Sequence, residues 1–318
     1  MFMEISSEEI KNLYTRLSNN ESLDILLRDL EDLLKVKKNS LPILLIKGMC
    51  YFKLRKYDEC EKIFKYTLEI FPNDVNALSN YGVFLINLSR YKESKNIYKS
   101  LIQHQPKNQN FLNSLGISYF HLGDLDTSLS IFSKALEIND HDHNSLLNYA
   151  NTLMELGVLG DAEVYYKKLL LINKGSHLAL YNLGIINKKN GDLQTSKSFL
   201  LRSIETNNKF SPAHNTLGVV FQEMGLIKES ISQFKKAIEL EPNNNLPKLY
   251  LIILYLSVCY WSDYKQQVNF LLSLKDSNFP FPPFYFLSLE DSPENQIIRS
   301  KKWFSKFKIQ SKIIVKKM

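Results

Sequence analysis

The chain has 318 residues, of which 44% are hydrophobic, so it can bury a continuous core and is not a disordered polypeptide. Its formal net charge is +7, but residues 299–318 contain basic side chains and no acidic one, and the rest of the sequence is close to neutral. This distribution argues against a nucleic-acid footprint along the body of the protein, so no nucleic-acid partner is expected.

Targeting signals are not evident in the sequence. The N-terminus lacks a basic stretch followed by an apolar one, so no secretory signal is predicted. The longest apolar run, residues 249–261, is shorter than the roughly 20 residues that a membrane span needs. The cysteines Cys50, Cys60 and Cys259 are odd in number and show no C-x-x-C spacing, which suits a reducing compartment. We therefore expect a cytoplasmic protein.

The first predicted element, residues 7–40, is a degenerate copy of the repeat that follows it. Its apolar residues keep the register of that repeat at Ile10, Leu13, Leu17, Leu30 and Leu33. Tyr14 stands where the repeat expects glycine.

Residues 41–244 contain six repeats of 34 residues. Pro72, Pro106 and Pro242 are separated by multiples of 34, and taking each as position 32 of a unit requires no insertion or deletion. The units are then 41–74, 75–108, 109–142, 143–176, 177–210 and 211–244. A fixed period of this length is the sequence signature of a repeat architecture.

Two glycine columns support this register independently. Position 8 is glycine in five units and alanine in the fourth, which allows two helices to approach closely. Position 15 is glycine in the last four units, where left-handed backbone angles would end the first helix. Position 20 is small, whereas position 24 holds a large apolar side chain, so each unit is predicted to form a helix–turn–helix. One such pair cannot bury both faces and must stack on its neighbours.

These units resemble tetratricopeptide repeats, most clearly in YNLGIINKKNGDLQTSKSFLLRSI (181–204) and HNTLGVVFQEMGLIKESISQFKKAIELEP (214–242). The resemblance implies an all-α, right-handed solenoid of antiparallel helix pairs, in which the first helices line an inner groove. Residues 245–275 are expected to form C-terminal capping helices. Residues 276–318 are expected to contain a proline-rich loop, a short helix and a basic tail.

Asparagines recur near position 6 of the repeats, just before the apolar residue and glycine of positions 7 and 8. Position 6 supplies Asn80, Asn148 and Asn182, and position 5 supplies Asn113 and Asn215 where position 6 is not asparagine. A side-chain amide can both donate to and accept from a peptide group. The predicted function is therefore a scaffold that binds extended segments of other proteins in its groove. The alternative interpretation is that these amides only solvate an exposed helix face.

The sequence after the repeats favours a second hypothesis. The cluster Cys259, Trp261, Asp263 and Tyr264, followed by the proline-rich stretch 279–304, is similar to the segment that follows the repeats in O-GlcNAc transferase-like proteins. This resemblance implies the substrate-recognition half of a protein glycosyltransferase, with catalytic lobes that are missing or separately encoded. No glycine-rich phosphate loop occurs within the chain, so no catalytic residue and no cofactor are predicted here.

Two other features were weighed as binding sites. The loop 139–144 contains Asp140, His141, Asp142 and His143, but consecutive loop side chains diverge, so no metal site is predicted. The tail 299–318 alternates lysine with aromatic and aliphatic residues, a composition that can contact anionic membranes. A frayed, solubilising end explains the tail more simply, and membrane contact stays the lesser hypothesis.

Overall fold

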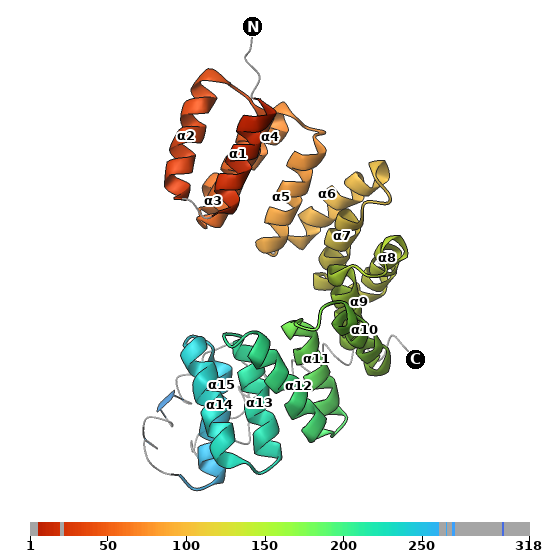
Figure 1. Ribbon diagram of the computed structural model, residues 1–318, viewed down its shortest axis with the longest axis vertical. Coiled ribbons are helices and arrows are strands. Elements are labelled where there is room, and N and C mark those ends of the chain that lie inside the picture. Colours follow the sequence, from red (N-terminus) through yellow and green to blue (C-terminus); the bar gives the residue numbers. More distant parts are fainter. Residues whose placement is uncertain (1–5, 20–21, 261–264, 266–268, 271–300, 302–318) are drawn as a thin grey trace. The chain divides into compact units, whose positions relative to one another are not determined.

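The computed structural model describes residues 6–19, 22–260, 265, 269–270 and 301, and fifteen α-helices make up its regular structure (Figure 1). The all-α fold class predicted from the sequence is confirmed. The chain divides between Lys174 and Gly175 into two compact units, which we describe separately.

Unit 1 contains five helix pairs. They are α1 (Ser7–Ser18) and α2 (Leu23–Val36), α3 (Leu41–Lys53) and α4 (Tyr57–Ile70), α5 (Val75–Asn87) and α6 (Tyr91–His104), α7 (Gln109–His121) and α8 (Leu125–Ile138), and α9 (His143–Glu155) and α10 (Leu159–Ile172). From α3 onward the first helix of each pair begins 34 residues after the previous one. Each first helix packs on its own second helix, and α1, α3, α5 and α7 also pack on the first helix of the next pair.

Unit 2 continues the same period. Its helices are α11 (His177–Lys189) and α12 (Leu193–Thr206), α13 (Ser211–Glu223) and α14 (Ile227–Leu240), and α15 (Asn245–Ser257). The first helices α11, α13 and α15 again begin 34 residues apart. Each of the two complete pairs forms an antiparallel hairpin like those of unit 1.

The glycine at position 8 makes room for the large side chain at position 24 of the same hairpin. A Cβ added to Gly116 would lie 2.5 Å from Cε1 of Phe132, and one added to Gly82 would lie 2.7 Å from Cε2 of Tyr98. The rings of Phe132 and Tyr98 are almost fully buried. The ring thus occupies the space that a side chain on the first helix would need, and this contact sets how closely the two helices approach.

A hydrogen bond next to this contact explains the small residue at position 20. The hydroxyl of Ser128 donates to the carbonyl oxygen of Gly116 at 2.9 Å. Ser196 and Ser230 make the same bond to the position-8 glycines of their own hairpins, at 2.8 and 2.7 Å. A larger residue would separate the helices, whereas serine fits the gap and satisfies its buried hydroxyl.

The turn inside each hairpin uses a left-handed residue at position 15. Gly123, with φ of 81°, is one of four glycines that confirm the predicted helix end. Arg55, Ser89 and Cys259 occupy the same position with φ between 56° and 59°. The left-handed turn therefore persists where the sequence lacks glycine, because the stacked hairpins impose this conformation on residues that disfavour it.

A network of ion pairs links the second hairpin of unit 1 to the third. Arg90, the residue before α6, lies 2.8 Å from Glu61 of α4 and 2.7 Å from Glu93 of α6. Lys65 also pairs with Glu61, at 2.9 Å. The hydrogen bond from Arg90, followed by that from Lys65, lowers the pKa of Glu61 from 4.5 to about 2.

Among the residues described, no helix combines the length and the apolar character needed to cross a membrane.

The tight contact at position 8 leads to a prediction about stability. We expect Gly116→Ala to destabilise the protein by about 1–3 kcal/mol, because the added Cβ forces the Phe132 ring out of its place. Gly160→Ala in α10 is the matched control, since a Cβ there meets no atom within 4 Å and should stabilise the helix by about 0.4–1 kcal/mol. Thermal unfolding followed by circular dichroism measures both. Equal midpoints for the two variants would contradict the packing argument.

The lowered pKa of Glu61 leads to a prediction about pH. Because the pKa is depressed in the folded state, the stabilisation is present above the unfolded value of 4.5 and is lost as the pH falls toward about 2. Between about pH 6 and pH 3 the wild type should lose up to about 1 kcal/mol more stability than Glu61→Gln. Urea unfolding at both pH values measures this difference. Parallel losses in the two proteins would show that the network contributes little.

Candidate functional site

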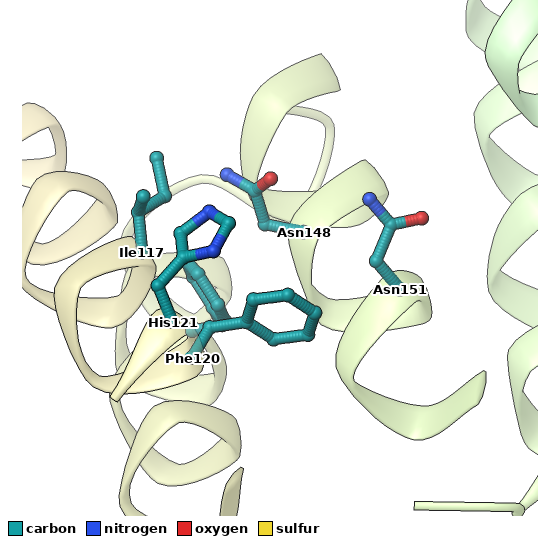
Figure 2. Close-up of a pocket in the computed structure, with 6 residues that line it drawn as sticks. Ile117, Phe120, His121, Asn148 and Asn151 are labelled. Atoms are coloured by element: carbon teal, nitrogen blue, oxygen red, sulfur yellow. The ribbon is translucent and has the colours of Figure 1, made fainter. Parts of the chain in front are cut away.

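A pocket opens between the first helices of two successive hairpins of unit 1. Its walls are formed by α7 and α9, and its volume is about 210 Å³. The lining residues are Ile117, Phe120 and His121 of α7, Phe132 of α8, and Asn148 and Asn151 of α9. Figure 2 shows the apolar and aromatic side chains of α7 on one side and the two amides of α9 on the other.

The α7 wall of the pocket is held in place by stacked rings. The imidazole of His121 lies parallel to the ring of Tyr91 from α6, with 4.4 Å between centroids. Phe120 packs edge-on against the same imidazole at 5.3 Å. Partial desolvation lowers the pKa of the His121 imidazole below its usual value, although the residue as a whole is exposed. No lysine, arginine, aspartate or glutamate lines the pocket.

The two amides of the α9 wall differ in their bonding. The hydroxyl of Tyr166 donates to Oδ1 of Asn151 at 2.6 Å, which orients that amide. Asn148 lies one helical turn earlier and is half-buried. Among the residues described, its side chain makes no hydrogen bond, although its backbone carbonyl accepts one from Thr152. The Asn148 amide is thus available to a ligand that enters the pocket.

The other two predicted amides of unit 1 have different surroundings. Asn80 on α5 is half-buried and, within the part of the chain described, forms no side-chain hydrogen bond. Asn113 on α7 is buried, accepts from the Ser145 hydroxyl at 3.0 Å and donates to Asp142 at 3.3 Å. Asp142 itself caps α9. The amide of Asn113 therefore connects two hairpins.

Unit 2 contains the remaining two predicted amides. Asn182 of α11 is buried and takes part in interactions within the fold. The Oδ1 atom of Asn215 on α13 is buried without a hydrogen-bond partner among the described residues. Lys188 of α11 is paired with Glu223 of α13 at 3.0 Å, so its charge is matched within unit 2.

Of the residues that line the pocket, only Asn148 was predicted as a site residue from the sequence. Ile117, Phe120 and His121 occupy positions 9, 12 and 13 of the third repeat. Position 9 lies one helical turn beyond position 6, on the same face of the first helix as the predicted amides. It is apolar in five of the six repeats and is Asn151 in the fourth. An apolar column beside an amide column was the signal that could have revealed the pocket.

The loop 139–144 and the segment that begins at Cys259 were also considered as sites from the sequence. Asp140 bonds to His141 and pairs with Lys168 at 2.8 Å, so its charge is satisfied by its neighbours. Cys259 is the exposed turn residue that follows α15, in the register of the repeat. The rest of its predicted cluster (Trp261, Asp263 and Tyr264) and the loop 279–300 fall outside the described residues, as does the tail 302–318.

Stacked helical hairpins with a fixed period define a helical repeat solenoid, and the comparisons with known proteins agree. A sequence family described as "Psidin, N-terminal TPR repeats region" matches residues 8–131. The family described as "Tetratricopeptide repeat" matches residues 178–210 and 211–244. The chain therefore contains tetratricopeptide repeats in these two stretches. No protein with a curated description matches it.

Two solved structures share the fold. A tetratricopeptide repeat protein from Parabacteroides merdae has a TM-score of 0.65 at 16% identity, and the match covers 78% of this chain and 98% of that one. The APC/C hetero-tetramer Cut9–Hcn1 gives a TM-score of 0.61 at 19% identity, covering 94% of this chain and 61% of the matched one. At these identities the similarity establishes the architecture alone.

The different bonding of the amides predicts different effects of removing them. Asn113→Ala should destabilise the protein by about 1–3 kcal/mol, because Ser145 and Asp142 lose a buried partner. Asn148→Ala should change stability by less than about 0.5 kcal/mol, since its side chain has no partner to lose. Thermal unfolding of both variants measures the contrast. A large loss in Asn148→Ala would reveal a structural role for that amide.

Proposed function

We propose that this protein is an interaction scaffold that binds extended segments of other proteins along its first helices. The observation that carries the proposal is the Asn148 amide, which is half-buried in the wall of a pocket and has no hydrogen-bond partner among the residues that the structure describes. A polar group in that setting gains a hydrogen bond when a ligand supplies a peptide carbonyl or amide. The pocket lies between two first helices. The resemblance to tetratricopeptide repeats implies that the first helices line the binding groove.

The amide column contributes unequally to this function. Asn80 and Asn148 are the peptide-binding candidates of unit 1, separated by one repeat in which Ser114 occupies position 6. Asn182 and Asn215 are the candidates of unit 2, where the buried Oδ1 of Asn215 lacks a partner among the described residues. Asn113 is hydrogen-bonded to the next hairpin, so its role is structural.

The alternative function is the substrate-recognition half of an O-GlcNAc transferase-like glycosyltransferase, with a separately encoded catalytic domain as its partner. It rests on the sequence of residues 259–304 alone. A glycosyltransferase reading frame directly downstream would favour it. Both hypotheses predict peptide binding, so the binding experiment comes first.

Binding to a peptide library tests the proposed function. Immobilised peptides of about ten residues are suitable, because an extended chain of that length spans roughly 33 Å, enough to cross several helices packed about 10 Å apart. We expect Asn148→Ala and Asn182→Ala each to weaken binding about two- to tenfold through loss of one hydrogen bond.

The control for this experiment is Asn96→Ala. Asn96 is exposed on α6, the second helix of its hairpin, and its removal should leave binding unchanged. Equal binding by the wild type and by a combined Asn148→Ala and Asn182→Ala variant would reject a role for these amides in holding peptide.

A further inference from the structure

The size of the α7–α9 pocket limits what can occupy it. Its volume of about 210 Å³ is below the roughly 300–1,000 Å³ that is usual for a site enclosing a whole small molecule. A single large side chain is a better match for this volume. Phe132 also lines the pocket and is itself almost fully buried, so the occupant meets a further apolar surface.

The chemistry of the lining excludes charged occupants. Ile117 and Phe120 present apolar surface, and no lysine, arginine, aspartate or glutamate lines the pocket. A lysine or glutamate side chain would lose water here without meeting an opposite charge, which is costly. A leucine, phenylalanine or tryptophan side chain would instead remove apolar area from water on both sides of the contact.

The amides of Asn148 and Asn151 on α9 determine which polar groups of a ligand the pocket can bind. Asn148 faces the pocket with an amide that no described residue bonds, and it can reach the peptide group next to an inserted side chain. Asn151 is held by the Tyr166 hydroxyl at 2.6 Å, so that side of the wall is oriented before a ligand arrives. An apolar pocket with one available amide at its wall fits a residue within a polypeptide.

A second apolar side chain lies one repeat earlier, on the same face of the first helix α5. Val83 of α5 occupies the position equivalent to Ile117 and is 43% exposed, unusually open for valine. Because α5 packs against α7 and packed helices stand about 10 Å apart, an extended chain advances roughly three residues between these positions. The surface thus presents the α7–α9 pocket and the exposed Val83 side chain at the spacing of an extended segment.

We propose that the α7–α9 pocket is the specificity site of unit 1, and that it takes one large uncharged side chain of an extended protein segment. Asn148 holds the backbone beside that side chain, and Val83 offers a weaker apolar contact about three residues away. This inference rests on the proposed peptide-binding function and adds to it the chemical class of the segment that unit 1 selects.

A positional peptide library tests the inference. The peptides have an extended background of serine, threonine and glutamine, and one central residue is alanine, leucine, phenylalanine, tryptophan, lysine or glutamate. Wild-type protein should bind the leucine, phenylalanine and tryptophan peptides about tenfold or more tightly than the others, as expected for burying one apolar side chain. Fluorescence anisotropy of labelled peptides gives the dissociation constants.

Two pocket variants and two comparison variants separate specificity from general binding. Phe120→Ala and Ile117→Thr, which keeps the β-branch but shortens the side chain and adds a hydroxyl, should reduce the preference for apolar central residues to below about threefold. Asn148→Ala should weaken all peptides by a similar factor and preserve the preference. Phe199→Ala is the control, because Phe199 is a half-buried ring on α12, the second helix of a hairpin in unit 2.

The possible outcomes distinguish this inference from the function on which it rests. If no peptide binds the wild type, the peptide-binding function itself is wrong, and the inference is overturned with it. If peptides bind with dependence on Asn148 but without preference at the central residue, only the specificity site is refuted. A preference for lysine or glutamate, or an apolar preference that survives in folded Ile117→Thr, would also refute it.

Discussion

The absence of a side chain at position 8 is the constraint on which the rest of this structure depends. An added Cβ at Gly116 would lie 2.5 Å from the Phe132 ring, and comparable distances occur at the other position-8 glycines. In the third hairpin the Phe132 ring lies against the first helix in the space that glycine leaves empty. The serine bond to the glycine carbonyl then closes the same gap. Stacking at a fixed period follows, because each hairpin presents the same shape to the next.

This contact also connects the core to the pocket. Phe132 fills the space at Gly116 and at the same time lines the α7–α9 pocket. The pocket is therefore shaped by a ring whose position the hairpin already fixes. A site supported in this way needs little rearrangement to receive a ligand, so less side-chain entropy is lost on binding.

The periodic part of the molecule could be predicted from the sequence, whereas the individual roles of similar residues could not. The proline and glycine spacing led to the helical hairpins and to the turn at Gly123, because backbone geometry at those positions depends on local sequence. Arg55 and Ser89 adopt the same turn without a local signal, since the stack imposes it. The sequence assigned the same peptide-binding role to Asn113, at position 5 of its repeat, and to Asn148, at position 6. Only the structure shows that Asp142 and Ser145 of the next hairpin engage Asn113 and leave Asn148 available.

The pocket lies at the point where the repeat departs from its own pattern. In the fourth repeat Ala150 replaces the position-8 glycine, and position 9 is Asn151 where the other repeats are apolar. Position 24 of this repeat is Tyr166, and its hydroxyl bonds to the Asn151 amide at 2.6 Å. A phenylalanine there would satisfy packing but could not orient the amide. The departures from the repeat are therefore coupled to one another, and together they place an ordered polar group beside an apolar cavity. A sequence that maintains a period over six units and breaks it at adjoining positions is consistent with a functional requirement at that place.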